Sequence, residues 1–162
     1  MPLDLKAELT SRLKGATKVV LLGVGSDLRG DDAAGMLVAE QLSNIPTLSV
    51  LLGGTAPENL TGEIKKSRPS HLLIVDAADM KAEPGTVKLL TPEEIGGFSF
   101  STHALPLKVM VDFILADCPC AVMIIAVQPA NVHFGAPVHP AVKAAVDSVV
   151  DALKAALPSS NP

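Results

Sequence analysis

The sequence has few aromatic residues, with four Phe, no Trp and no Tyr among 162 residues. Proteins that bind single-stranded nucleic acid stack bases on aromatic side chains. The sequence also has no excess of basic residues, because 13 Lys and Arg stand against 17 Asp and Glu, for a net charge of −4. Binding to nucleic acid depends on clustered positive charge. We therefore expect no nucleic-acid partner.

Long apolar runs are also missing. The longest uninterrupted one, residues 118–127, contains Pro119 and is ten residues long, whereas a membrane-spanning helix needs about 20. Residues 1–15 carry charges of both signs, and Leu5, Leu9 and Leu13 recur at helical spacing. This pattern is typical of a short amphipathic helix and not of a secretory signal. We expect no membrane association and a cytoplasmic location.

Only two cysteines are present, Cys118 and Cys120. One residue separates them, so they are too few and too close for a disulfide framework or a complete zinc site. We interpret them as small residues that lead into a buried strand.

Hydrophobic residues, in contrast, are plentiful, at 48% of the chain. A chain of this length and composition is expected to fold around a single core. We predict one domain over residues 1–157, a frayed tail over residues 158–162, and a monomer.

Apolar runs alternate with helical patterns along the chain. Dense aliphatic runs at residues 18–25, 48–52, 71–75 and 121–127 are typical of buried strands. Helical patterns cover residues 33–42, 57–66, 106–115 and 142–156. A further strand at residues 86–90 follows residue 76 too closely for a parallel crossover and is expected to be antiparallel. These elements predict an α/β fold, a three-layer α/β/α sandwich with a mixed, mostly parallel five-stranded sheet.

Carboxylates follow two of the predicted strands. Asp31 and Asp32 come after the first strand, and Asp76 and Asp79 follow the third. Ligands of open α/β sheets bind beyond the carboxyl ends of the strands, where the winding direction reverses. If these two strands are neighbours, the carboxylates share one crevice. The alternative is that Asp31 and Asp32 only cap a helix, because helix starts favour Asp.

The histidines extend this hypothesis. His71 begins a buried strand and is interpreted as structural, whereas His103 lies in a polar turn and could reach the crevice. Two carboxylates with one imidazole suit a divalent ion such as nickel, zinc or manganese. A dinucleotide site is disfavoured because Leu28 occupies the sixth position of the glycine pattern. A phosphate loop is disfavoured because acidic residues begin the next helix.

Six segments resemble the maturation endopeptidases of nickel-iron hydrogenases, most closely the type that serves the hydrogenase of formate hydrogenlyase. Their order and spacing extend across most of the chain. The segments are LLGVGSDLRGDDAAG at 21–35, GGTAPEN at 53–59, RPSHLLIVDAADM at 68–80, PGTVKLLTPEEI at 84–95, STHALPL at 101–107 and VQP at 127–129.

The resemblance implies an α/β/α sandwich and a single cut that removes the C-terminal extension of a hydrogenase large-subunit precursor once nickel has been inserted. The family's metal-contacting positions fall on Asp32, Asp76 and His103, which would be both the catalytic and the metal-binding residues. The nickel would be supplied by the large subunit, the attacking group would be water, and the precursor would be the partner. This chain departs from the family pattern at Ser26, Ala33 and Leu52, which replace Asn, Gly and, relative to many members, Asp.

Two other hypotheses stay open. The chain could be a flavodoxin-like ligand- or metal-binding module without protease activity. It could also be a generic metal-dependent peptidase that cuts unrelated short peptides. We predict that Asp32, Asp76 and His103 converge within metal-coordinating reach.

Overall fold

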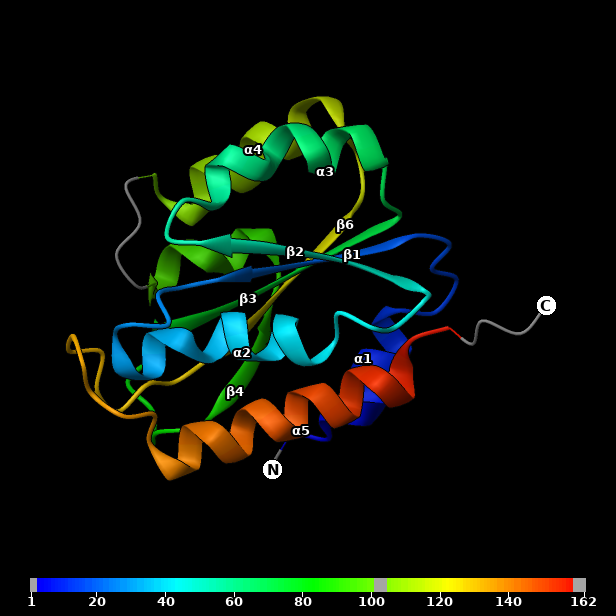
Figure 1. Cartoon of the computed structure of the whole chain (residues 1–162). Helices are drawn as coiled ribbons and strands as arrows, with labels where there is room; N and C mark the ends of the chain where they lie inside the picture. The colour runs from blue at the N-terminus through cyan, green and yellow to red at the C-terminus, as the bar shows by residue number, and fades with distance from the viewer. Residues whose placement is uncertain (1–2, 101–104, 159–162) are drawn as a thin grey trace.

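Four parallel strands form most of the sheet in the computed structural model, which describes residues 3–100 and 105–158 (Figure 1). Their order, with an antiparallel strand at one edge, is β2-β1-β3-β6-β4. The bounds are β1 Val19–Val24, β2 Leu48–Gly54, β3 His71–Asp79, β4 Val87–Leu90 and β6 Ala121–Val127. The predicted α/β sandwich and the antiparallel strand near residues 86–90 are both confirmed.

Helices cover both faces of the sheet (Figure 1). The helices α1 (Leu5–Arg12), α2 (Ala34–Gln41) and α5 (Pro140–Ala156) pack on one face, and α3 (Thr61–Ser67) and α4 (Leu107–Asp117) pack on the other. Each face has its own cluster of buried aliphatic side chains. Such burial is the main stabilising contribution to a fold of this type.

The strand β1 shows why the apolar runs predicted buried strands. All six of its residues are buried, and their side chains alternate between the two clusters. The helix α5 buries Val142, Val146, Val149 and Leu153 against the sheet, as its helical spacing predicts.

Two features differ from the predicted sheet. The strand β3 continues four residues beyond Val75, because β6 still pairs with it at Asp76 and Ala77. In addition, β5 (Ser99–Phe100) pairs antiparallel with the last two residues of β3, giving six strands instead of five. Both extensions depend on pairing between distant segments, which an apolar run does not reveal.

The chain winds in opposite directions on the two sides of β1. From β1 it passes through α2 to β2 on one side, and then through α3 to β3 on the other side. Pairing between β1 and β3 ends at Gly23 and Val75, and β1 then shifts register against β2. The two strands therefore part at the position where α/β proteins bind ligands.

Three 3-10 segments connect these elements. They are η1 (Gly30–Ala33), η2 (Pro57–Leu60) and η3 (Pro92–Gly97). Within the described ranges, we find no helix whose length and hydropathy would suit a bilayer crossing. Most of the predicted tail, residues 159–162, lies outside the described residues.

Candidate functional site

The loop after β1 folds tightly around Asp32, which lies on η1. Gly25 has a φ of +134°, and a Cβ added there would overlap the carbonyl oxygen of Asp32. Because only glycine adopts this backbone conformation without strain, this position permits the loop to close on η1. The backbone N–H of Ser26 then donates to Asp32 Oδ2 at 2.9 Å.

The second oxygen of Asp32 has a different environment. The side chain is only 3% exposed, and Oδ1 is buried with no hydrogen-bond partner among the described residues. An unsatisfied buried carboxylate oxygen is costly, so such atoms in native proteins call for an explanation such as an ion or a ligand. Carboxylate oxygen is a suitable ligand for a divalent cation.

Asp76 lies inside β3 and not after its end, which corrects the sequence interpretation. It is fully buried, and it is the first residue of β3 beyond the last pairing with β1. By strand alternation, it shares a face with Leu72 and Ile74, whose side chains pack in the cluster beneath α3 and α4.

The start of α2 connects the two aspartates. A Cβ at Gly35 would overlap the backbone oxygens of both Val24 and Val75. The helix that follows Asp32 therefore begins directly over the ends of β1 and β3, against the backbone of Val75, the residue before Asp76. Two buried carboxylates thus belong to the same switch point of the sheet.

The third predicted ligand, His103, lies outside the described residues. Within residues 3–100 and 105–158, no three His, Cys, Asp or Glu side chains form a group that could hold a metal ion. The convergence of Asp32, Asp76 and His103, and their catalytic and metal-binding roles, stay predictions.

Asp31 is a buried carboxylate with a structural environment. Its Oδ2 accepts hydrogen bonds from the backbone N–H groups of Ala130 (2.7 Å) and Asn131 (2.9 Å), and its Oδ1 accepts one from His139 (2.7 Å). The helix-cap interpretation is therefore wrong for Asp31, and also for Asp32, because neither η1 nor α2 has a side-chain cap. Asp31 instead holds the segment 128–139, here called the β6–α5 loop.

Asp79, the fourth candidate carboxylate, stabilises a turn. Its Oδ1 accepts hydrogen bonds from the backbone N–H of Lys81 at 3.1 Å and from Gln128 Nε2 at 3.3 Å. The Lys81 N–H, followed by the Gln128 amide, lowers the pKa of the Asp79 carboxyl. Gln128 Oε1 in turn accepts from the backbone N–H of Met80 at 2.6 Å. These local bonds account for Asp79 without a ligand.

Two of the other histidines, His71 and His139, have structural contacts. His71 begins β3, and its Nδ1 lies 2.9 Å from Ser70 Oγ, as the structural interpretation predicts. His139 Nδ1 accepts a hydrogen bond from the backbone N–H of Ala141 at 3.0 Å and caps α5.

The cysteines do not form a reactive pair. Cys118 ends α4 and is buried, and Cys120 directly precedes β6. Desolvation by burial, reinforced by Cys118, raises the pKa of the Cys120 thiol to about 11. A neutral thiol is a poor nucleophile and a poor metal ligand at neutral pH.

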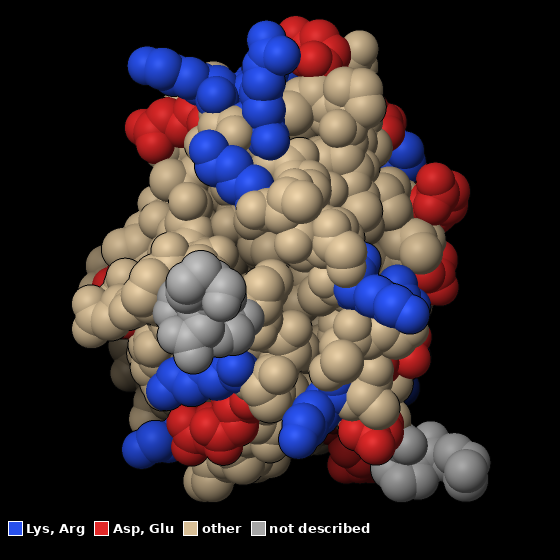
Figure 2. Space-filling view, turned by 90° about the vertical axis from the view of Figure 1, so that its right-hand side faces the viewer, with Lys and Arg blue, Asp and Glu red and all other residues tan. Residues whose placement is uncertain are grey.

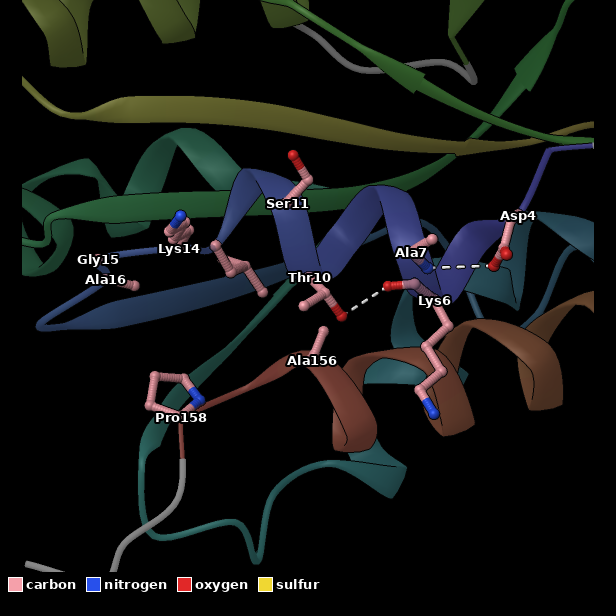
Figure 3. A pocket seen from close by; sticks show the side chains of 11 residues that line it. Asp4, Lys6, Ala7, Thr10, Ser11, Lys14, Gly15, Ala16, Ala156 and Pro158 are labelled. Atoms are coloured by element: carbon pink, nitrogen blue, oxygen red, sulfur yellow. Dashed lines mark hydrogen bonds between the residues drawn. The ribbon is translucent and has the colours of Figure 1, made fainter.

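The other end of the parallel strands, where they begin, has basic side chains and a groove on its surface. Figure 2 views this side and shows Lys and Arg side chains gathered at its upper end, at the level of α3 and α4 in Figure 1. A groove of about 980 Å³ lies between α1 and the end of α5, and Figure 3 shows the side chains that line it. Its polar groups include Asp4 and Thr10, whose hydrogen bonds are local to α1. Neither Asp32 nor Asp76 lines this groove.

Sequence reasoning did not identify the β6–α5 loop as part of this region. The loop reaches Asp31 across about 100 intervening residues, and no local motif marks that pairing. A usable signal was the lack of any charged residue from Gln128 to His139, which is unusual for an irregular segment that a buried carboxylate holds in place.

Comparison with known proteins gives consistent matches. The profile of the hydrogenase maturation protease family HycI matches residues 36–156. The hydrogenase 3 maturation protease of Escherichia coli K12 is 39% identical over 138 residues, covering 83% of this chain and 88% of that protein.

Solved structures agree. The crystal structure of the NiFe hydrogenase maturation protease HycI from Thermococcus kodakarensis KOD1 superposes with a TM-score of 0.82 at 30% identity, covering 91% of this chain and 96% of that one. The solution structure of the endopeptidase HycI from Escherichia coli has a TM-score of 0.75 at 38% identity, covering 83% and 88%. The chain therefore belongs to the hydrogenase maturation protease family and is a peptidase.

Proposed function

We propose that this peptidase removes the C-terminal extension of a nickel-iron hydrogenase large-subunit precursor after nickel has been inserted. The observation that carries the proposal is the buried Oδ1 of Asp32, which has no hydrogen-bond partner within residues 3–100 and 105–158 and lies at the switch point of the sheet in a peptidase of this family. Membership of the family favours peptidase activity over the binding-module alternative. A cytoplasmic location belongs to the same proposal.

Asp32, Asp76 and His103 are the proposed ligands of the substrate's nickel. Asp32 and Asp76 supply oxygens from the two sides of the strand separation. His103 follows Phe100, which pairs with Ala78, two residues beyond Asp76. Three residues of chain span at most about 10 Å, so the connection permits an imidazole to reach this crevice.

Such a ligand set suits contact with nickel that the substrate holds better than permanent binding of nickel by the enzyme. Carboxylates and a neutral imidazole bind nickel moderately, and they lack the soft thiolates that retain a metal firmly. The purified protein alone is therefore expected to carry little nickel. A precursor that already holds the ion gains an additional contact with the enzyme, whereas an empty precursor does not.

The proposed cleavage step is hydrolysis by water. Water adds to the carbonyl carbon of the scissile peptide bond, the C–N bond breaks, and the released amine takes up a proton. A carboxylate of the site can accept the proton of the attacking water. The raised pKa of Cys120 and the burial of Cys118 disfavour a thiolate nucleophile.

The test is cleavage of matched precursors. The purified protein is mixed with nickel-loaded large-subunit precursor, nickel-free precursor and unrelated short peptides with added nickel, and products are measured by mass spectrometry. We expect a single cut in the loaded precursor alone. Equal cutting of the nickel-free precursor would contradict nickel sensing, and cutting of the short peptides would indicate a generic metal-dependent peptidase.

A further inference from the structure

Two large apolar side chains are exposed, one on the segment that leads to Asp32 and one on the loop that Asp31 holds. Leu28, in the loop after β1, is 62% exposed, and Phe134, in the β6–α5 loop, is 76% exposed. Both loops lie at the edge of the sheet where the parallel strands end (Figure 1). An exposed Phe is costly in water, and exposed apolar groups that gather near a functional site are typical of an interaction surface.

These side chains lie on two segments that are joined by backbone hydrogen bonds. The N–H of Gly135 donates to the carbonyl of Leu28 at 2.9 Å, and the N–H of Asp31 donates to the carbonyl of Asn131 at 2.9 Å. The three bonds to the Asp31 carboxylate hold the same loop. The β6–α5 loop is thus fixed to the segment that carries Asp32, and its position does not depend on packing of Phe134.

The loop is also free of charge. From Gln128 to His139 it contains no Asp, Glu, Lys or Arg. A partner that covers this loop therefore desolvates no Asp, Glu, Lys or Arg side chain of the loop, which favours an apolar partner there. Leu28, on the other segment, is flanked by the exposed Asp27 and Arg29. Leu28 lies four residues before Asp32 in the segment that joins β1 to α2, so the surface lies close along the chain to the proposed cleavage site.

We infer that Leu28 and Phe134 form a docking surface for apolar side chains of the precursor beside the scissile bond, and that Asp31 is the residue that positions it. This inference rests on the proposed function and names how the substrate is held. It separates two roles of adjacent residues, with Asp31 fixing the docking loop and Asp32 facing the reaction.

The test is steady-state processing of the nickel-loaded precursor by Leu28→Ala, Phe134→Ala and the double variant. Phe134→Ala removes an aromatic contact that the bound precursor would bury, and it is expected to raise KM about tenfold. The double variant is expected to raise KM more. The kcat should stay within about twofold of the parent value, because the reacting groups are untouched. Thermal melting checks that the variants, which change only exposed side chains, are folded.

Phe113→Ala is the matched control. Phe113 is 55% exposed on α4, and the ammonium group of Lys65 lies 3.5 Å from its ring centroid. Lys65 also pairs with Asp117 at the end of α4, before β6 begins, so this Phe lies toward the opposite edge of the sheet. Its loss should leave KM unchanged.

The role of Asp31 is tested by coupling. Asp31→Asn should raise KM. Phe134→Ala should raise KM by a smaller factor in the Asp31→Asn background than in the parent, because the substituted side chain no longer holds the loop. An equal rise in KM from Phe134→Ala in both backgrounds would overturn the positioning role of Asp31. If Asp31→Asn fails to fold, the variants at Leu28 and Phe134 still decide the docking role.

Each result bears on a separate claim. A parent that cleaves the precursor with a Phe134→Ala variant of unchanged KM would overturn the docking inference alone. A parent that cleaves no precursor would overturn the proposed function and this inference with it. A parent that dimerises in analytical ultracentrifugation, with Phe134→Ala monomeric, would assign the surface to self-association and overturn its role in substrate binding.

Discussion

The two ends of the parallel strands differ in how their polar groups are hydrogen-bonded. Where the parallel strands begin, Ser70 Oγ accepts hydrogen bonds from the backbone N–H groups of Thr17 and Lys18, both at 3.0 Å, and His71 adds another contact. Where they end, Asp32 retains a buried oxygen without a described partner. At the first end, the Ser70 hydroxyl connects the segment before β1 to the start of β3 and stabilises the fold. The second end leaves the buried Oδ1 of Asp32 without a described hydrogen-bond partner. This lowers the stability of the fold, as is common at functional sites.

The largest expected effect is loss of processing when the proposed nickel ligands are removed. Asp32→Asn, Asp76→Asn and His103→Ala should each lower cleavage of the loaded precursor by at least about 100-fold, because each removes a proposed ligand of the substrate's nickel. Processing is followed by gel shift and mass spectrometry, and melting temperature is measured alongside. Asp27→Asn, an exposed carboxyl in the same loop, is the control. A variant that is folded and cleaves at the parent rate is not a required ligand.

Asp31→Ala should have the largest effect on stability. It leaves three buried or partly buried N–H groups without their acceptor, so the free energy of unfolding should fall by about 2–4 kcal/mol. Urea denaturation measures this change, with Asp27→Ala expected to stay within about 0.5 kcal/mol of the parent. Comparable stabilities for the two variants would show that the β6–α5 loop does not depend on Asp31.

Ser70→Ala tests the opposite edge. Because this hydroxyl joins the segment before β1 to the start of β3, its loss should lower stability by about 1 kcal/mol and leave processing unchanged. The exposed Ser11→Ala serves as the control in the same denaturation series. Impaired processing at parent-like stability would mean that this edge also takes part in the reaction.

The smallest effect concerns Cys120. With its thiol pKa raised to about 11, little thiolate exists near pH 7.5, and alkylation by iodoacetamide should be more than tenfold slower than for a free cysteine. The rate should increase as the pH rises toward 11, and Cys120→Ser should process the precursor normally. A Ser11→Cys variant gives the exposed reference thiol. Rapid alkylation of Cys120 at neutral pH would contradict a half-buried, neutral thiol.

Local sequence patterns predicted the fold well, because an aliphatic run such as residues 18–25 indicates a buried strand whichever strands lie beside it. They predicted the end of β3 less well. The apolar run stops at Val75, but β6 and β5 continue to pair with the polar and small residues that follow. Strand length was therefore decided by partners elsewhere in the chain.

The adjacent aspartates show the limit for the site. Sequence placed Asp31 and Asp32 together after β1, and nothing local distinguishes their roles. Asp31 is identified as structural only through donors 99, 100 and 108 residues away. Asp32 was singled out by resemblance to a family, and in the part of the chain that the structure describes its buried Oδ1 has no hydrogen-bond partner.

If Asp32 contacts nickel that the substrate already holds, the affinity of the protein for the precursor depends on that nickel, and equilibrium binding measures this dependence. The affinities of the parent and of Asp32→Ala are measured for nickel-loaded and nickel-free precursor by calorimetry. The parent should bind the loaded form more tightly, and Asp32→Ala should bind both forms equally, because differential affinity requires a differential contact. An Asp32→Ala variant that keeps the full preference for the loaded precursor would contradict the account.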